Sequence, residues 1–369
     1  MTNTSFALAK RHKNDEFYTQ YTDIEKEMNA YLDYDPDVFR GKVILLPCDD
    51  PEWSNFTRYF AQNFERFGLK KLISTSYAPQ SKPDLFGYEP TIMERSSTHF
   101  DASKTLTRGK LFVITNDHNC DGKIDFDDLI WDYLEGDGDF RSDEVTALRD
   151  EANIVITNPP FSLFREYMAW IMDGEKEFVA IANKNCITYK EIFPLIRDNR
   201  MWVGRTPLSE DMLFTSHNEI DPDDYPKTAT RTVNGAVYLR SPSVWFTNLE
   251  HGRRHQPLPL MSMADNLKFN KKLRKKLDGL NHYHKYDNYE AIEIPFTDAI
   301  PSDYDGVMGV PITFLDKYCP EQFEILDAND FRKNEHVTKK PHGLIKDKDG
   351  TVVGDPKPKY ARILIRKIQ

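Results

Sequence analysis

The chain has 369 residues with a formal net charge of −10, and 39% of its residues are hydrophobic. This length suits one large α/β domain and a smaller one, and the ordinary hydrophobic content argues against global disorder. The acidic balance excludes an all-over basic coat, the apolar runs are too short to span a membrane, and four widely spaced cysteines predict reduced thiols in the cytoplasm.

Short apolar runs alternate with helical patterns through the first half of the chain. We expect strands at 42–46, 70–75, 110–115, 153–157 and 177–182. Ser54 is a candidate cap for a helix that carries apolar residues at helical spacing and stops at Gly68. Strands separated by helices predict an α/β fold with a parallel, doubly wound, Rossmann-like sheet.

Beyond about residue 205 the alternation becomes less regular. We expect a hairpin of strands within 232–248, a basic helix over 268–277 and a final strand at 359–367. The sequence therefore predicts two domains, with a boundary near residue 250: a larger one at 1–250 and a smaller one at 251–369.

The first predicted strand ends at Pro47, Cys48, Asp49 and Asp50. A Rossmann-like sheet binds its cofactor at this position. The usual glycine-rich loop is missing, which suits a cofactor that has no phosphate group to be cradled. Acidic side chains here are suited to amino or hydroxyl groups of a ligand, although two solvated turn aspartates give the same pattern.

An insertion at residues 117–128 has the ligand spacing of a calcium-binding EF-hand loop, with Gly122 at its sixth position. The expected segment before it is a strand rather than a helix, and the last ligand is Asp rather than Glu. A structural Ca²⁺ and a metal-free, Asx-rich turn therefore both remain open. The candidate metal ligands are Asp117, Asn119, Asp121, Lys123, Asp125 and Asp128.

The tetrad Asn158-Pro159-Pro160-Phe161 directly follows the strand expected at 153–157, and Ser162 is a candidate cap for the helix beyond it. The two prolines fix φ and remove backbone donors, which leaves carbonyl oxygens and the Asn amide to bind a planar amino group. Phe161 is placed to stack on a base that has left its helix. This arrangement suits methylation of an exocyclic amine such as N6 of adenine, whereas the simpler alternative is a run that only breaks structure.

The densest basic run lies within the helix expected at 268–277. Along a helix these side chains can contact a phosphate backbone, although a solvated helix face is the alternative. The candidate DNA-binding residues are Lys268, Lys271, Lys272, Arg274, Lys275 and Lys276.

The chain resembles the EcoRI-type family of adenine-specific DNA methyltransferases, which is common in bacteria and their phages. The resemblance follows the order of the family's blocks across most of the chain. The matching blocks are 15–19, 47–56, 138–142, 157–165, 187–193, 245–249 and 304–316.

The resemblance implies S-adenosylmethionine as methyl donor and N6 of adenine in duplex DNA as acceptor. It assigns Asn158, Pro159, Pro160 and Phe161 to the catalytic block. It assigns the cofactor to Phe17, Tyr18, Thr19, Pro47, Cys48, Asp49, Asp50, Asp139 and Phe140, of which the last two match an adenine-contacting block. The run Gly136–Asp139 is also an ordinary turn composition. The second strand, within 71–77, lacks the acidic residue that usually binds the ribose.

We therefore expect a site-specific DNA adenine-N6 methyltransferase that flips its target base, with catalysis in 1–250 and target recognition in 251–369. The expected partner is double-stranded DNA in a bacterial or phage-infected cell, with a cognate restriction endonuclease possible but not bound directly. The alternatives are methylation of RNA adenine or of a protein glutamine, an inactive DNA-binding relative, and a Ca²⁺-responsive binding module.

Overall fold

The computed structural model describes residues 18–51, 54–78, 90, 94–95, 97–216, 220–286, 290–326, 345–346 and 362–368. The chain divides into two compact units. Unit 1 comprises Met1–Lys184 and Gly204–Glu250, and unit 2 comprises Asn185–Val203 and His251–Gln369. The chain therefore passes between the units three times. Residues 185–203, which the predicted division at residue 250 groups with the N-terminal region, lie in unit 2.

The predicted strands and helices of unit 1 are largely present. Its strands are β1 (Tyr18–Thr19), β2 (Val43–Leu46), β3 (Lys71–Ser76), β4 (Lys110–Ile114), β5 (Ile130–Tyr133), β6 (Ile154–Thr157), β7 (Glu177–Asn183), β9 (Met212–Thr215), β10 (Thr230–Val233), β11 (Ala236–Ser241) and β12 (Ser243–Thr247). Its α-helices are α2 (Tyr21–Tyr34), α3 (Asn55–Gln62), α4 (Phe64–Phe67), α6 (Asp143–Glu151) and α7 (Phe164–Asp173).

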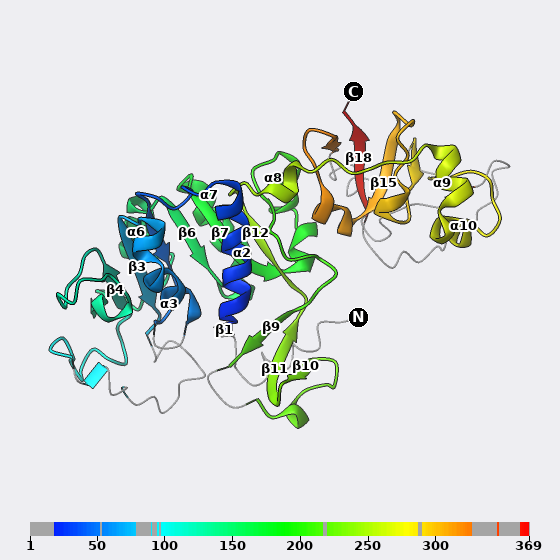
Figure 1. Cartoon of the computed structure of the whole chain (residues 1–369). Helices are drawn as coiled ribbons and strands as arrows, with labels where there is room; N and C mark the ends of the chain where they lie inside the picture. The colour runs from blue at the N-terminus through cyan, green and yellow to red at the C-terminus, as the bar shows by residue number, and fades with distance from the viewer. Residues whose placement is uncertain are drawn as a thin grey trace. The chain divides into compact units, whose positions relative to one another are not determined.

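The large sheet of unit 1 has the strand order β5-β4-β3-β2-β6-β7-β12 (Figure 1). It is mixed, so the prediction of a parallel sheet is only partly correct. Strands joined by a covering helix run parallel, as β2 and β3 do through α3 and α4, and β6 and β7 through α7. A loop with one short 3₁₀ turn joins β4 to β5, and those two strands run antiparallel.

Alternate residues of the sheet face two different layers of helices. Ile44 and Ile154 lie in the main hydrophobic cluster together with side chains of α2, α3 and α4. On the opposite face, the ring of Phe164 in α7 packs 5.6 Å from the ring of Phe246 in β12. Helices α2 to α4 therefore cover one face of the sheet, and α7 covers the other.

A second sheet of unit 1 has the order β1-β9-β11-β10, with all of its pairs antiparallel. Asn234 and Gly235 join β10 to β11 with φ values of 51° and 83°, which a tight hairpin turn requires. The prediction of a hairpin within 232–248 is thus displaced: the hairpin is β10–β11, and β12 pairs with β7 in the large sheet.

Unit 2 contains a sheet with the order β16-β18-β15-β14-β13-β17. The strands of this sheet are β13 (Lys285–Tyr286), β14 (Ala291–Glu293), β15 (Val307–Pro311), β16 (Phe323–Ile325), β17 (Ile345–Lys346) and β18 (Arg362–Lys367). Unit 2 also contains β8 (Trp202–Val203), which is not part of this sheet. Its α-helices are α8 (Phe193–Arg197), α9 (Met263–Phe269) and α10 (Lys271–Leu277). Strand β18 confirms the predicted final strand, of which 359–361 lie outside the described residues.

The basic helix predicted over 268–277 is interrupted. Asn270 ends α9 with φ −76° and ψ 97°, and its side-chain oxygen accepts a hydrogen bond from Leu273 N at 3.0 Å. An Asn cap of this kind begins a new helix, so the basic run is divided between two short helices. Within the described part of the chain, no helix combines the length and apolar character needed to cross a membrane.

Candidate functional site

Two predicted motifs meet where the strand order of the large sheet reverses. Strand β2 lies between β3 and β6, so the chain proceeds outward from β2 in both directions. Open α/β sheets bind ligands at the carboxyl ends of strands at such a switch point. The loop after β2 begins with Pro47, and its carbonyl oxygen accepts a hydrogen bond from Thr157 Oγ1, at the end of β6, at 2.6 Å. This bond fixes the start of the predicted cofactor loop beside the start of the tetrad.

The tetrad forms a tight, partly buried turn. Pro159 is buried, whereas Asn158 and Phe161 are half-buried. Leu163 N donates to the Pro160 carbonyl oxygen at 2.9 Å, which closes a 3₁₀ turn over Phe161–Leu163. Ser162 lies inside this turn and does not cap α7, contrary to prediction, because the α-helix begins only at Phe164. The turn leaves Asn158 at the strand end, ahead of any helical backbone.

The N-terminal block reaches the same place through β1. Thr19 pairs with Phe214 of β9, and Asn55 Nδ2 at the start of α3 donates to the Thr19 carbonyl oxygen at 2.8 Å. The Phe161 ring packs edge-on against Phe214 at 6.4 Å. Tyr18 and Thr19 therefore lie between the α3 terminus and the tetrad. Phe17 lies outside the described residues.

Asp49 holds the cofactor loop from within. It is 5% exposed, and its Oδ2 accepts from Thr57 N at 3.2 Å and from Thr57 Oγ1 at 2.8 Å. The Ser54 hydroxyl donates to Asp49 Oδ1, and Ser54 Oγ accepts from Phe56 N at 3.1 Å as the predicted cap of α3. Burial raises the pKa of Asp49 to about 7, against the opposing effect of these hydrogen bonds. The carboxylate predicted to meet a ligand is thus turned into the protein.

The neighbouring residues of the loop are more open. Cys48 and Asp50 are half-buried, and Cys48 has a φ of 62°, in the left-handed region that is unusual for residues other than glycine. Such a conformation is often found at functional sites. Cys48 and Asp50, rather than Asp49, are therefore the partly accessible residues of this loop.

Asp139 is brought to the end of β3. Tyr77, which follows β3, has its hydroxyl 3.5 Å from Asp139 Oδ2, and Ala78 N donates to the Asp137 carbonyl oxygen at 2.7 Å. The Arg141 guanidinium donates to both carboxylate oxygens of Asp139, at 2.9 and 2.6 Å. These bonds lower the pKa of Asp139. Burial and the carboxylates of Asp137 and Asp139 raise the pKa of Tyr77 to about 12, so the phenol stays protonated as a donor.

Phe140 supports this loop from the interior. It is 2% exposed, and its ring lies 5.6 Å from the rings of both Tyr167 and Trp170 in α7. The ring of Phe140, which the resemblance assigns to an adenine-contacting block, thus packs against α7. The loop that carries Asp139 is consequently fixed to the helix that follows the tetrad.

Thr19 Oγ1, Thr75 Oγ1 and Tyr167 OH are buried and have no hydrogen-bond partner among the described residues. Thr19 belongs to the predicted cofactor block, Thr75 O accepts from Asp49 N at 2.7 Å, and the Cys48 thiol contributes to the raised pKa of Tyr167. An unsatisfied buried polar group costs about 1–3 kcal/mol, so each of these oxygens is a candidate to bind a polar ligand or water. This fits a cofactor that carries hydroxyl and amino groups.

Sequence reasoning did not identify Thr75, Tyr77 or Tyr167. Thr75 and Tyr77 lie in the stretch that lacks the usual ribose-binding acid, and this gap was the available signal. Tyr167 is part of the apolar helical repeat and carries no separate signal.

The predicted metal centre at 117–128 is not supported. Among the described residues, no three His, Cys, Asp or Glu side chains come together to hold a metal ion. The oxygens instead accept backbone N–H groups: Asp128 Oδ1 binds His118 N at 2.6 Å and Asn119 N at 3.1 Å, and Asp117 Oδ2 binds Gly122 N at 2.8 Å. Similar bonds involve the side chains of Asn119, Asp121 and Asp125. These are the hydrogen bonds of an Asx-rich turn, the alternative to a metal site.

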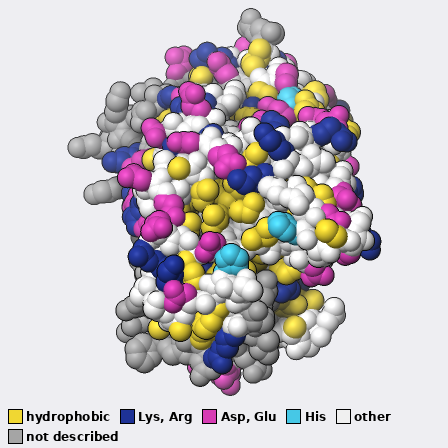
Figure 2. Space-filling model, turned by 90° about the vertical axis from the view of Figure 1, so that its left-hand side faces the viewer, with side chains coloured by type: hydrophobic (Ala, Val, Ile, Leu, Met, Phe, Trp, Pro, Cys, Tyr) yellow, Lys and Arg dark blue, Asp and Glu magenta, His cyan; other side chains and the backbone are white. Residues whose placement is uncertain are grey.

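The candidate DNA-binding residues lie in unit 2, Lys268 on α9 and the others on α10, and all six are exposed. On the face drawn in Figure 2, Lys and Arg side chains are interspersed with Asp and Glu around a central group of apolar side chains. The basic run differs from that face, since it has six cations within nine residues.

The comparisons with known proteins agree across the whole chain. The family model described as "Adenine-specific methyltransferase EcoRI" matches residues 5–368. The Type II methyltransferase M.EcoRI of Escherichia coli is 40% identical over 370 residues, covering 99% of this chain and 97% of the relative. The Type II methyltransferase M.MpnI of Mycoplasma pneumoniae is 31% identical, covering 99% and 98%. No solved structure matches the chain.

Proposed function

The chain belongs to the EcoRI family of adenine-specific methyltransferases, and we propose that it methylates N6 of adenine in duplex DNA with S-adenosylmethionine as donor. One observation carries this proposal most directly. The hydrogen bond of 2.6 Å between Thr157 and Pro47 holds the amine-binding tetrad beside the loop at which such a sheet binds its cofactor. Donor and acceptor sites therefore adjoin on neighbouring parallel strands.

The tetrad is proposed to hold the target amine. The Asn158 side-chain oxygen and the Pro159 carbonyl oxygen accept hydrogen bonds from N6, and Phe161 stacks on the flipped base. Two acceptors on one amino group favour a tetrahedral nitrogen with an available lone pair. The bound cofactor supplies an activated methyl group. Positioning by the rigid Pro159–Pro160 turn provides most of the catalysis, and N6 loses its extra proton to solvent afterwards.

The cofactor site is proposed to lie between β1, the loop after β2 and the end of β3. Tyr18, Thr19, Cys48 and Asp50 would contact the cofactor, and Asp139 would accept from its adenine amino group while Arg141 keeps the carboxylate ionised. Pro47, Asp49 and Phe140 would position these groups, since all three are buried. The unsatisfied oxygens of Thr19 and Thr75 support a polar ligand here.

We propose that unit 2 contributes target recognition in double-stranded DNA. The basic run on α9 and α10 supplies positive charge for the phosphate backbone. The described cysteines are free thiols, as expected of a protein that meets its DNA in the cytoplasm of a bacterial or phage-infected cell. A cognate restriction endonuclease would act on the same site without binding this chain.

The test is mass spectrometry of nucleosides from unmethylated duplex DNA incubated with the protein and S-adenosylmethionine. We expect N6-methyladenine from the unsubstituted protein and none from Asn158→Ala, which should still bind the cofactor. Ser162→Ala is the matched control, because this neighbouring side chain is exposed and makes no cap. It should keep full activity.

The other outcomes identify the alternatives. Cofactor binding without methylation of DNA would contradict the proposal and direct the assay to RNA adenine or protein glutamine. Absence of cofactor binding would indicate an inactive DNA-binding relative. Equal loss of activity in Asn158→Ala and Ser162→Ala would remove the specific function assigned to Asn158.

A further inference from the structure

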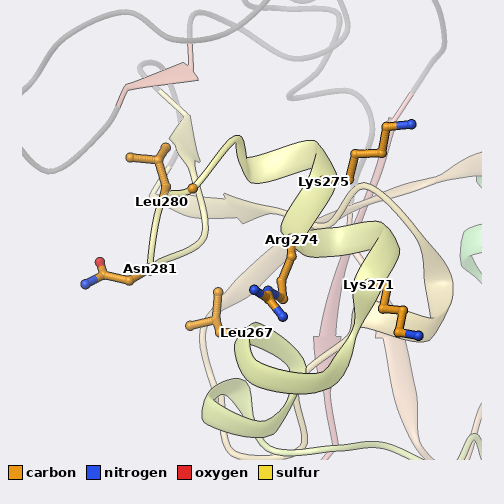
Figure 3. Close-up of a pocket in the computed structure, with 7 residues that line it drawn as sticks. Leu267, Lys271, Arg274, Lys275, Leu280 and Asn281 are labelled. Carbon is orange, nitrogen blue, oxygen red and sulfur yellow. The ribbon is translucent and has the colours of Figure 1, made fainter.

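The basic run of unit 2 borders a cavity of about 670 Å³ next to α10. Three cations line it, Lys271, Arg274 and Lys275, together with the Asn281 amide and the apolar side chains of Leu267 and Leu280. Figure 3 shows the Arg274 side chain directed towards Leu267, whereas the side chains of Lys271 and Lys275 leave the same helix in the opposite direction. None of the seven residues that line the cavity is acidic.

The structure divides the six cations of the run into two sets. Lys271, Arg274 and Lys275 are spaced i, i+3 and i+4, so they share one side of α10. The other three are not part of the cavity lining. The Lys272 ammonium lies 3.8 Å from the Asp298 carboxylate, and the Lys268 ammonium lies 4.9 Å from the centre of the Phe269 ring.

The cavity cations lie close together on α10. Like charges three and four residues apart repel one another, and Lys271 lies at the positive end of the helix dipole, whereas Arg274 and Lys275 lie in the last turn, where the dipole favours cations. Within the described helix α10, no acidic residue occupies the first turn. Leu273 and Leu277, 0% and 3% exposed, hold the helix in place, so the charged side is kept despite this repulsion. A bound anion would offset it.

The lining matches one unit of a nucleic-acid backbone. An Arg guanidinium presents paired N–H groups that fit phosphate oxygens, and Lys adds compact charge. Asn281 can donate a further hydrogen bond, and Leu267 and Leu280 offer an apolar wall for a sugar. The cavity is within the size range of small-ligand pockets and exceeds what a single phosphate needs.

We propose that this cavity, formed by Lys271, Arg274 and Lys275 with Leu267, Leu280 and Asn281, seats one phosphodiester-linked nucleotide unit of the DNA. This proposal rests on the proposed function, which identifies the nucleic acid as DNA. The seated phosphate fixes the register of unit 2 on the duplex, whereas Lys268, Lys272 and Lys276 add only diffuse attraction.

The test compares two triple variants with the same change in charge. The cavity variant carries Lys271→Gln, Arg274→Gln and Lys275→Gln, and its matched control carries Lys268→Gln, Lys272→Gln and Lys276→Gln. Binding of a fluorescent, unmethylated duplex of mixed sequence is measured by anisotropy over a range of salt concentrations. Because each neutralised phosphate contributes about 0.9 to the slope of log K against log salt, the cavity variant should lose about one unit of slope. Its affinity should fall at least tenfold, and the control should change less than twofold.

Equal losses in both variants, or none in the cavity variant, would overturn the proposal. Arg274→Lys keeps the charge but removes the fork, so affinity should fall with the slope unchanged; unchanged affinity would also overturn it. Polyglutamate of equal charge should displace the duplex poorly. If it displaces the duplex as strongly as unlabelled duplex does, the surface attracts any polyanion and has no specific site for a nucleotide, which would overturn the proposal. Unaltered thermal unfolding and cofactor binding verify that the variants fold.

The methylation assay separates this proposal from the proposed function. With DNA below saturation, the cavity variant should form N6-methyladenine more slowly than the unsubstituted protein, in proportion to its loss of affinity. Failure of the unsubstituted protein to methylate would refute the proposed function, while the binding comparison would still decide whether the cavity seats DNA.

Discussion

Replacing Gly138 by alanine should disrupt the loop that carries Asp139. Gly138 has a φ of 86°, and a Cβ placed there would lie 3.2 Å from the Ser76 carbonyl carbon and collide with its oxygen. Ser76 cannot move away easily, because it pairs with Lys110 in the large sheet. A left-handed backbone costs an L-residue about 1–2 kcal/mol, and overpacking against fixed backbone adds about 1–3 kcal/mol. The total is about 2–5 kcal/mol at this loop.

Gly122 provides the matched control, since its φ is 87° and a Cβ there meets nothing within 4 Å. Gly122→Ala should cost only about 1–2 kcal/mol, from the backbone alone. Isothermal titration with S-adenosylmethionine is the assay. Because about 1.4 kcal/mol corresponds to a factor of ten and the strain at Gly138 falls on the Asp139 loop, Gly138→Ala should weaken cofactor binding at least tenfold. Gly122 lies in the 117–128 loop, outside the proposed cofactor site, so Gly122→Ala should weaken cofactor binding less than twofold. Equal effects of the two substitutions would refute the assignment of the Asp139 loop to the cofactor site.

Three further predictions concern the same unit. Asp49 has a folded-state pKa of about 7, above its usual 3.8, so its contribution to stability is complete below about pH 4 and is lost as the pH rises through 7. The free energy of unfolding, measured with denaturant from pH 4 to 8, should therefore fall by at most about 4 kcal/mol, and Asp49→Asn should reduce this fall. An unchanged pH profile in Asp49→Asn would contradict the burial of the carboxylate. Thr75→Val should leave the melting temperature unchanged or raised, because the hydroxyl has no partner among the described residues, and should weaken cofactor binding; intact binding would exclude this oxygen from the site. Addition of EDTA should alter neither the melting temperature nor the activity, because the oxygens of 117–128 accept backbone N–H groups; a fall that Ca²⁺ reverses would restore the metal hypothesis.

Local patterns were sufficient for much of unit 1. The strands before Pro47 and Asn158 and the Ser54-capped helix follow from hydrophobic periodicity and cap chemistry over a few residues. Strand direction was less accessible: β3 and β4, which were both predicted, run antiparallel, and an apolar run carries no direction. Strand β5 was not predicted. Asn270 was also misjudged, since the same residue type can occupy a helix or begin one.

The arrangement of the site depends on contacts between distant residues. Thr157 reaches Pro47 only because β2 and β6 are neighbours in the sheet, and nothing near either residue indicates this. Asp49 is turned inward because Ser54 and Thr57 offer it hydrogen bonds after the chain has entered α3. Residue type therefore predicted the location of the loop, whereas the direction of each side chain required the folded structure.

The interleaving of the two units affects how this chain can be assembled or recombined. Residues 185–203 belong to unit 2, where Asn199 Oδ1 accepts from Tyr318 OH at 3.2 Å and the Arg254 guanidinium lies 3.9 Å from the centre of the Trp202 ring. During synthesis this segment leaves the ribosome long before Arg254 and Tyr318, so its contacts with them can form only after those residues have been synthesised. Truncation after residue 250 would leave Trp202 without these partners. To exchange unit 2 with that of a relative of different specificity, both of its segments, 185–203 and 251–369, would have to be replaced. A single crossover at residue 250 would combine residues 185–203 of one parent with residues 251–369 of the other.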